Sequence, residues 1–228
     1  MIKAVLFDFD ETLQDRTAAF ENYMDTFFDE FLPDLDVQER ERRKEEMRVT
    51  GNGGYVTHNG YASRDEWYED LAHRWKWDDA PSGAELTLHY DTKFGDHNVI
   101  FPNSEKLLCE LKKRGYIVGV VTNGPSLLQN HKMDVSGLRK YCDIVVVSGD
   151  VGVHKPDPKL FIYTADKLGL RTDECVYVGD HPVNDIQGAL SAGMKAIRMN
   201  YGWFCDKDLR DDVPVIDDII QVLDYIHS

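Results

Sequence analysis

Residues 3–13, with the sequence KAVLFDFDETL, constrain this chain more than any other stretch. The apolar run from Ala4 to Phe7 predicts a buried strand, which ends at two carboxylates, Asp8 and Asp10. An open α/β sheet binds its ligands beyond the carboxyl ends of its strands. Two like charges buried at such a place need a cation or a proton to offset them, so this stretch predicts a metal ion.

After Pro102, apolar runs and amphipathic stretches alternate along the chain. We expect strands at 116–121, 144–147, 175–178 and 195–199. Helices are expected at 104–114, 126–131, 136–141, 183–192 and 216–226, and a further helix follows the loop around Lys155 and ends at Leu168. Strands and helices that alternate at this spacing predict an α/β fold with a doubly wound parallel sheet.

Residues 16–97 have a different pattern, in which every expected element is a helix. Helical spacing runs from about 18 to 32, the charged stretch 36–48 predicts a solvated helix, and another helix is expected at 84–94. Ser63 and Glu66 resemble a capping box that opens a further helix. The segment is far longer than a connection between adjacent parallel strands, so we expect an inserted all-helical cap domain at 16–97 and a core domain at 1–15 and 98–228.

Composition limits the class of protein and its partners. The 228 residues carry a formal net charge of −15, which argues against a nucleic-acid polymer or an anionic membrane as partner but permits a small anionic substrate. The four cysteines form no CxxC pair and are expected to be buried free thiols, which fits a reducing cytosol: Cys109, Cys142, Cys175 and Cys205. No signal peptide or membrane span is visible, so we expect a cytoplasmic protein that is a monomer or homodimer.

Four groups of polar residues follow predicted strands. They are Asp8 to Thr12, then Thr122-Asn123-Gly124, then Lys155 in a proline-stiffened loop, and finally Asp180 to Asp185. Each group alone occurs often by chance. In this order within an α/β pattern, however, they predict one shared site.

Together the four motifs resemble those of the haloacid dehalogenase (HAD) superfamily, whose members are mostly phosphatases. The match runs the length of the chain and includes the helical insertion, which in that family is a cap that closes over the active site. The resemblance implies that Asp8 is the nucleophile and forms an aspartyl-phosphate. Asp10 would protonate the leaving oxygen and then deprotonate the attacking water, and the family's dehalogenases lack this carboxylate.

The resemblance also implies Mg²⁺ as the cofactor. Asp8, the backbone carbonyl of Asp10 and Asp180 would hold the ion, with waters completing an oxygen shell. Asp185 would orient a metal-bound water or Lys155, although in some relatives it approaches the metal directly. Thr12 would contact the metal ligands without binding the ion itself.

Three residues are expected to bind the phosphoryl group. The hydroxyl of Thr122 and the backbone N–H of Asn123 would hold phosphoryl oxygens. Lys155 would neutralise charge on the nucleophile and on the transferring group, and is therefore also a catalytic residue.

Two residues depart from the family's pattern. Glu11 stands where many relatives have glycine, and we expect its side chain to point away from the site or to cap a backbone group. His181 stands where many have serine; it either contacts the substrate or the cap, or has no role. The Asp-Glu-Thr-Leu form of the first motif looks more like the nucleotidase-type members than the sugar-phosphate mutases.

The cap is expected to select the substrate because its residues would face the leaving group. The candidates are Arg16, Tyr55, His58, Tyr61, Trp67 and Tyr68, of which the aromatic ones could stack on a nucleobase. The favoured alternative for the tryptophans is that Trp67, Trp75 and Trp77 form the core of a small helical domain.

The sequence therefore predicts a Mg²⁺-dependent phosphomonoesterase that acts on a small phosphorylated metabolite, for example a nucleoside monophosphate. Two alternatives stay open: a phosphomutase acting on sugar phosphates and, less favoured, a non-catalytic phosphate-sensing protein on the same fold. The complete set of acidic residues argues against the last, because binding alone requires no general acid.

Overall fold

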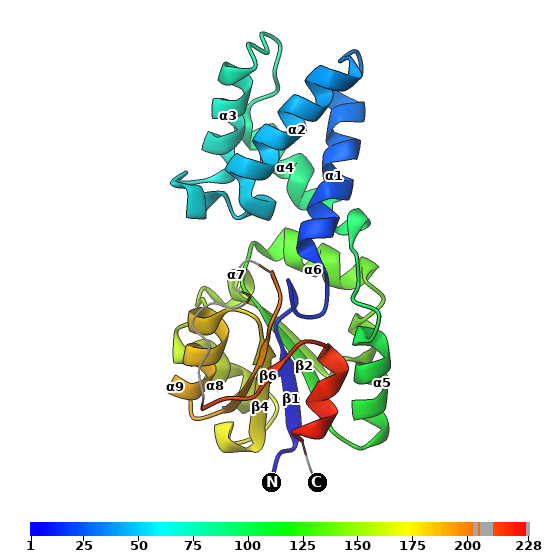
Figure 1. Ribbon diagram of the computed structural model, residues 1–228. Coiled ribbons are helices and arrows are strands. Elements are labelled where there is room, and N and C mark those ends of the chain that lie inside the picture. The colour runs from blue at the N-terminus through cyan, green and yellow to red at the C-terminus, as the bar shows by residue number, and fades with distance from the viewer. Residues whose placement is uncertain (203–204, 206–211, 227–228) are drawn as a thin grey trace. The chain divides into compact units, whose positions relative to one another are not determined.

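The structure is a computed structural model that describes residues 1–202, 205 and 212–226, apart from the side chain of His58. The chain divides into two compact units: unit 1 comprises Met1–Asp15 and Asn98–Ser228, and unit 2 comprises Arg16–His97 (Figure 1). Each unit is described by itself.

Unit 1 contains a six-stranded sheet in which every neighbouring pair is parallel. The strands are β1 (Ala4–Phe7), β2 (Ile117–Thr122), β3 (Ile144–Val147), β4 (Cys175–Gly179), β5 (Lys195–Met199) and β6 (Val215–Ile216). Their order across the sheet is β3-β2-β1-β4-β5-β6, so β1 is central and the order reverses beside it. The predicted fold class, an α/β doubly wound parallel sheet, is confirmed.

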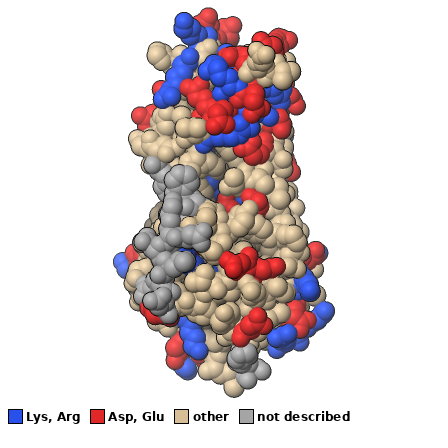
Figure 2. Space-filling model, in the orientation of Figure 1, with Lys and Arg blue, Asp and Glu red and all other residues tan. Residues whose placement is uncertain are grey.

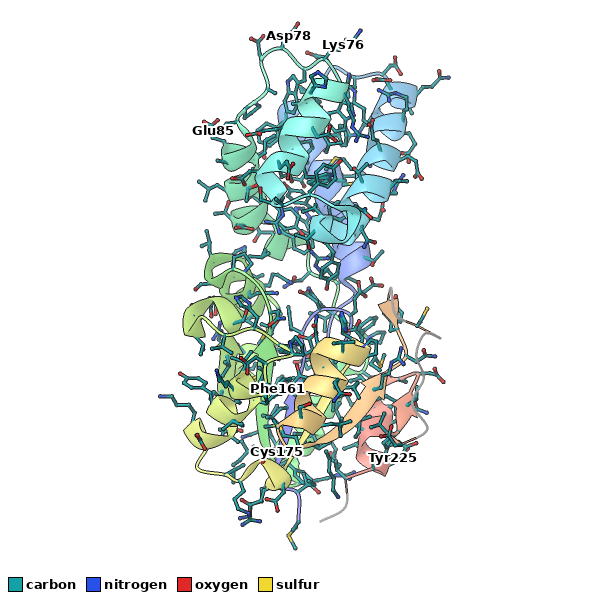
Figure 3. All side chains as sticks on the ribbon, turned by 90° about the vertical axis from the view of Figure 1, so that its left-hand side faces the viewer. Lys76, Asp78, Glu85, Phe161, Cys175 and Tyr225 are labelled. Carbon is teal, nitrogen blue, oxygen red and sulfur yellow. The ribbon has the colours of Figure 1, made fainter. Side chains whose placement is uncertain are left out.

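Helices cover both faces of this sheet (Figure 1). They are α5 (Ser104–Lys113), α6 (Ser126–Val135), η4 (Arg139–Tyr141), α7 (Ser148–Val151), α8 (Pro158–Lys167), η5 (Thr172–Glu174), η6 (Pro182–Gln187), α9 (Gly188–Ser191) and η8 (Ile219–Asp224). Val5 and Phe7 belong to one buried apolar cluster and Ala4 and Leu6 to another, as the alternation of side chains along a strand requires. Phe161 and Cys175 belong to the second cluster, and both are labelled in Figure 3.

The C-terminal part of the chain differs from the prediction of one helix at 216–226. Val215–Ile216 is instead strand β6, which pairs with β5, and η8 is a short 3-10 helix. A two-residue strand is too short to give an alternating pattern, so the apolar residues of both elements imitate one helical face. The predicted helix at 183–192 is likewise two pieces, the π-helix η6 followed by α9.

The described cysteines are all free, but only Cys175 is buried. Cys109 and Cys142 are partly buried and Cys205 is exposed, so the prediction of burial was wrong for these three. None of the helices among the described residues has the length and apolar character needed to cross a membrane.

Unit 2 is helical throughout. It contains α1 (Arg16–Phe31), α2 (Val37–Gly51), η1 (Asn52–Gly54), η2 (Val56–Asn59), α3 (Arg64–Arg74), α4 (Gly83–Lys93) and η3 (Phe94–His97). Its centre is aromatic, with the rings of Phe20, Tyr23, Trp67 and Tyr90 buried. Acidic and basic side chains are interspersed over its surface (Figure 2), for example the Arg43–Glu39 pair at 2.7 Å on α2.

Candidate active site

The parallel sheet of unit 1 brings the predicted motifs to one edge. Asp8 directly follows β1, Thr122 ends β2, and Asp180 directly follows β4. Because β1 pairs with both β2 and β4 in parallel, their carboxyl ends lie side by side. The carboxylates that are far apart in the sequence therefore meet where the strand order reverses.

Lys155 is the cation at the centre of this edge. Its Nζ lies 2.8 Å from Asp8 Oδ1 and 2.7 Å from Asp185 Oδ1, and donates to the hydroxyl of Tyr177 at 2.9 Å. That hydroxyl in turn donates to the Val121 carbonyl at 2.8 Å. Lys155 and Asp185 are buried, so the ammonium is held by three partners rather than by solvent. Sequence reasoning missed Tyr177, because it lies within β4 in an apolar run that indicates only a buried strand.

Three carboxylates at this edge could hold a metal ion. Oxygens of Asp8, Asp180 and Asp185 lie within 4.8 Å of one another, and all three residues are buried. Burial, with the neighbouring Asp185 and Asp10 charges, raises the pKa of Asp8 to about 7 against the attraction of Lys155. Burial also raises the pKa of Asp180 well above its usual value. Among the described residues, the ammonium of Lys155 does not balance these three carboxylates, and a hard divalent cation such as Mg²⁺ fits this oxygen-only donor set.

Asp185 has contacts that suit a supporting role. Its Oδ1 accepts from Lys155, and its Oδ2 accepts from the backbone N–H of His181 at 2.9 Å. The carboxylate lies so close to the end of β4 that a Cβ at Gly179 would be 2.5 Å from Asp185 Cγ. Glycine at 179 is therefore required for this approach.

The Lys155 loop is attached to the loop after β2 by Asn123. The side-chain amide of Asn123 donates to the Lys155 carbonyl at 2.9 Å, and its Oδ1 accepts from the Lys155 N–H at 2.9 Å. The side chain thus holds the Lys155 backbone in both directions. Its role is positional, while the predicted binding of phosphoryl oxygens by the backbone N–H of Asn123 and the hydroxyl of Thr122 stays a prediction.

Asp10 lies in a different environment from Asp8. Its carboxylate contacts Lys132 Nζ and Gln14 Nε2 through Oδ1, and Oδ2 accepts from Gln129 Nε2 at 3.0 Å. Sequence reasoning missed these three partners. Gln129 lay within a helix predicted at 126–131, which ended one residue before Lys132, whereas α6 continues to Val135.

Glu11 and Thr12 of the first motif are buried, whereas His181 of the fourth motif is partly buried. Glu11 has the left-handed φ of 55° and is buried, with its side chain against Gly202, and its charge helps to raise the pKa of Asp180. Its carboxylate therefore adds to the field of the site. The hydroxyl of Thr12 is buried and has no hydrogen-bond partner among the described residues. His181 Nδ1 accepts from the N–H groups of Val183 and Asn184, both at 3.1 Å, and so caps η6.

Within unit 2, the substrate candidates are engaged in local contacts. The guanidinium of the buried Arg16 lies 3.7 Å over the ring of Tyr55 and donates to the Tyr90 hydroxyl at 3.3 Å. Tyr61 donates to Asp70 at 2.6 Å instead. The side chain of His58 lies outside the description. Trp67 and Tyr68 are buried in the aromatic core, as is Trp75, and Trp77 is partly buried.

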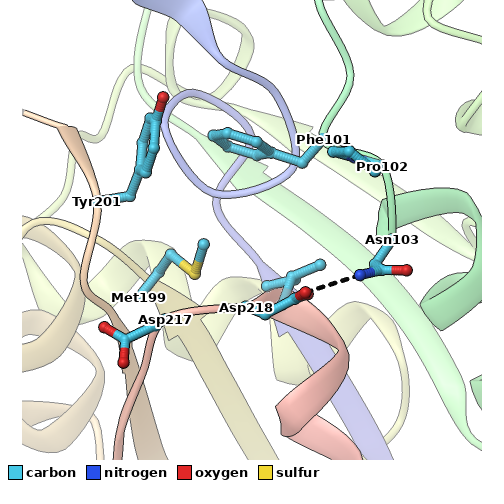
Figure 4. Close-up of a pocket in the computed structure, with 8 residues that line it drawn as sticks. Phe101, Pro102, Asn103, Met199, Tyr201, Asp217 and Asp218 are labelled. Carbon is cyan, nitrogen blue, oxygen red and sulfur yellow. Dashed lines mark hydrogen bonds between the residues drawn. The ribbon is translucent and has the colours of Figure 1, made fainter.

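Unit 1 also has a cavity of about 160 Å³, and the described residues that line it belong to none of the four motifs. The described residues that line it come from the segments 101–103, 199–201 and 217–219 (Figure 4). Asn103 donates to Asp218 Oδ2 at 2.7 Å across it, and the rings of Phe101 and Tyr201 meet edge to face. The candidate chemistry therefore does not depend on this cavity.

Comparison with known proteins identifies the family of this fold and site. The family model for haloacid dehalogenase-like hydrolases matches residues 2–193. The chain belongs to this family, and the predicted superfamily is confirmed. A glyceraldehyde 3-phosphate phosphatase from Methanopyrus kandleri is 34% identical over 100% of this chain and 98% of its own. Another from Pyrococcus furiosus is 30% identical over 91% and 85% of the two chains.

A phosphoserine phosphatase from Thermus thermophilus is 36% identical over 50% of this chain and 44% of its own. Among solved structures, a HAD phosphatase from Thermococcus onnurineus has a TM-score of 0.65, with 27% identity over 98% and 97% of the two chains. A putative HAD-hydrolase from Bacillus subtilis bound to magnesium shares the fold, with a TM-score of 0.78 and 20% identity over 98% of each chain. The predicted enzyme class, a hydrolase acting on phosphoric monoesters, is confirmed.

Proposed function

We propose that the chain is a Mg²⁺-dependent phosphomonoesterase that works through a phosphorylated Asp8. The observation that carries this proposal is the contact of Lys155 with Asp8 at an edge where three carboxylates converge. A buried carboxylate that is held by an ammonium on one side and faces a cation site on the other is suited to attack an anionic phosphorus.

The reaction follows from the roles of the two aspartates. An oxygen of Asp8 attacks phosphorus, the ester P–O bond breaks, and the leaving oxygen takes a proton from Asp10. Water then attacks the aspartyl-phosphate while Asp10 takes a proton from it, which releases inorganic phosphate and restores both carboxyl groups. Thr122 and the backbone N–H of Asn123 would hold the phosphoryl oxygens during both steps.

Asp8, Asp180 and the carbonyl of Asp10 would hold Mg²⁺, with Asp185 supporting them. The bound ion would supply charge neutralisation between the carboxylates and the phosphate. With the ion and Lys155 both present, Asp8 is kept ionised near neutral pH despite its burial.

We further propose a short phosphorylated metabolite as the substrate, with a triose phosphate as the first candidate. The support is the identity to two glyceraldehyde 3-phosphate phosphatases over most of their lengths. A nucleoside monophosphate is the second candidate. Its support is weaker because Trp67 and Tyr68 are buried in the core of unit 2 and offer no face for a base.

The unit at 16–97 would act as the cap. Our candidates for selecting the substrate stay the cap residues Arg16, Tyr55, His58 and Tyr61, together with His181 of unit 1. A cytoplasmic location and a monomeric or homodimeric state also stay predictions. They do not enter the argument about chemistry.

The test is phosphate release from a panel of phosphorylated metabolites, with and without Mg²⁺, for the natural chain and Asp8→Asn. The proposal requires release that depends on both Mg²⁺ and Asp8, fastest with a triose phosphate. Activity that survives Asp8→Asn or needs no divalent ion contradicts the mechanism. A phosphomutase would instead need a bisphosphate activator and release almost no phosphate, and a phosphate sensor would bind without turnover.

A further inference from the structure

We propose that Lys132 is a positioning residue that, with Gln14 and Gln129, holds the Asp10 carboxylate in place for proton transfer. Lys132 belongs to none of the four motifs. The inference rests on the proposed function, because it gives Lys132 a task only if Asp10 moves protons during phosphoester hydrolysis.

Three side chains contact the two carboxylate oxygens of Asp10. Lys132 Nζ and Gln14 Nε2 both contact Oδ1, and Gln129 Nε2 donates to Oδ2 at 3.0 Å. Side chains from two segments, one of them 122 residues away in the sequence, therefore grip both oxygens. A carboxylate held at both oxygens cannot rotate freely about its side-chain bonds, and proton transfer depends on such orientation.

Lys132 is fully buried. Its ammonium has no exposure to solvent, and it lies 5.4 Å from the centre of the Phe9 ring. Burying an ammonium costs several kcal/mol, which a carboxylate partner offsets only with good geometry. Apolar residues in place of the whole ion pair would avoid that cost, so stability alone does not explain why a lysine and an aspartate are buried together here.

The face of α6 that carries Gln129 and Lys132 also contacts the loop after β2. Gln129 and Lys132 are three residues apart on α6 and so lie on one face of the helix. Gln129 Nε2 also donates to the Asn123 carbonyl at 2.7 Å, and Asn123 in turn holds the Lys155 backbone. One face of α6 thereby fixes Asp10 relative to the loops that carry Asn123 and Lys155.

A double-mutant cycle between Lys132 and Asp10 tests this inference. The variants are Lys132→Met, Asp10→Asn and the pair, and the readout is kcat/KM with phenyl phosphate and with 2,4-dinitrophenyl phosphate. The dinitrophenolate leaves without a proton, so its release does not need Asp10. We expect Lys132→Met to lower kcat/KM about 100-fold with phenyl phosphate and less than about fivefold with the dinitrophenyl ester.

In the Asp10→Asn background, Lys132→Met should cause less than about a twofold further loss, because the group on which it acts is gone. An equal loss in both backgrounds, an equal loss with both esters, or no loss at all overturns the inference. If Lys132→Met does not fold, as judged by thermal unfolding, Gln129→Met replaces it in the same cycle under the same criteria.

Lys44→Met is the matched control, because Lys44 of unit 2 is also a buried lysine that pairs with an aspartate, Asp25. It should lower stability and leave the ratio of the two kcat/KM values unchanged. The proposed function fails separately: in that case, phosphate release would survive Asp8→Asn. An additive cycle with Asp8-dependent release rejects only the role of Lys132.

Discussion

The two sides of the first motif, around Asp8 and around Asp10, differ in how their charge is balanced. Among the described residues, Asp8 shares its edge with Asp180 and Asp185 and contacts the ammonium of Lys155. Asp10 faces the ammonium of Lys132 and two carboxamides. The first group has excess negative charge and needs a cation, whereas the second is balanced by the protein itself.

Because of this difference, one short loop can carry both a nucleophile and an acid–base group. A nucleophile must stay ionised and meet an anionic phosphate, which a cation at the same edge permits. An acid–base group must exchange protons in a fixed orientation, which hydrogen bonds from rigid side chains provide. Asp8 and Asp10 are the same residue type and lie two residues apart, so it is their tertiary contacts that suit one to the role of nucleophile and the other to that of acid–base group.

The sharpest test of this comparison replaces each aspartate by asparagine. With 2,4-dinitrophenyl phosphate, Asp8→Asn should lower kcat/KM at least about 10⁴-fold, a barrier increase of about 5 kcal/mol, because no covalent intermediate can form. Asp10→Asn should remain within about tenfold of the natural chain, since this leaving group needs no proton. Equal losses from both substitutions would remove the distinction between the two sides.

Removal of Mg²⁺ should reveal the excess charge at the Asp8 side. Burial raises the pKa of Asp8 from 3.8 to about 7, so between these values the folded protein holds a proton that the unfolded chain has lost. The metal-free protein should therefore lose about 2 to 4 kcal/mol of stability as pH rises through this window, and Mg²⁺ should restore it. Urea unfolding at pH 5 and pH 7.5, with Mg²⁺ or with EDTA, measures both changes.

Asp8→Asn is the control for that experiment, because asparagine has no proton to lose in this range. Its metal-free form should show a distinctly flatter pH dependence. If its unfolding free energy falls with pH as steeply as that of the natural chain, Asp8 is not the source of the effect.

A methyl group at Gly124 should disturb the Asp10 side first, through Gln129. Its φ is 149°, and a Cβ there would lie 2.8 Å from Gln129 Cγ. Gly124→Ala should therefore displace Gln129 and lower kcat/KM with phenyl phosphate about 10- to 30-fold, with a much smaller loss for the dinitrophenyl ester. Gly137→Ala is the matched control, since its φ is also positive, at 72°, but no atom lies within 4 Å of the added group.

The smallest effect is expected from Tyr177→Phe, on the Asp8 side. The hydroxyl accepts from Lys155 and donates to the Val121 carbonyl, and its loss leaves one hydrogen-bond partner fewer on each. We expect a stability loss of about 1 to 2 kcal/mol and a loss of activity of only a few fold, because Asp8 and Asp185 still hold the ammonium. A loss above a hundredfold would mean that Tyr177 does more than position Lys155.

Much of the fold was predictable because its signals are local. The strand at Ala4–Phe7 and the helix near 84–94 follow from runs and periodicities of apolar residues, which neighbouring residues alone set. Strand β6 was missed because two residues carry no period, and its existence depends on pairing with β5. The helix at 126–135 was predicted too short by four residues, which left Lys132 outside it.

That Asp8, Thr122 and Asp180 gather at one edge was predictable from the sequence, since each lies at the end of a strand and parallel strands end together. The reaction class was likewise predictable, through the order of the four motifs. The pairing of Lys155 with Asp8 and of Lys132 with Asp10 depends on tertiary packing. The sequence does not distinguish the roles of Lys155 and Lys132. The buried ion pair between Lys132 and Asp10, which are 122 positions apart, depends on packing that no local pattern encodes.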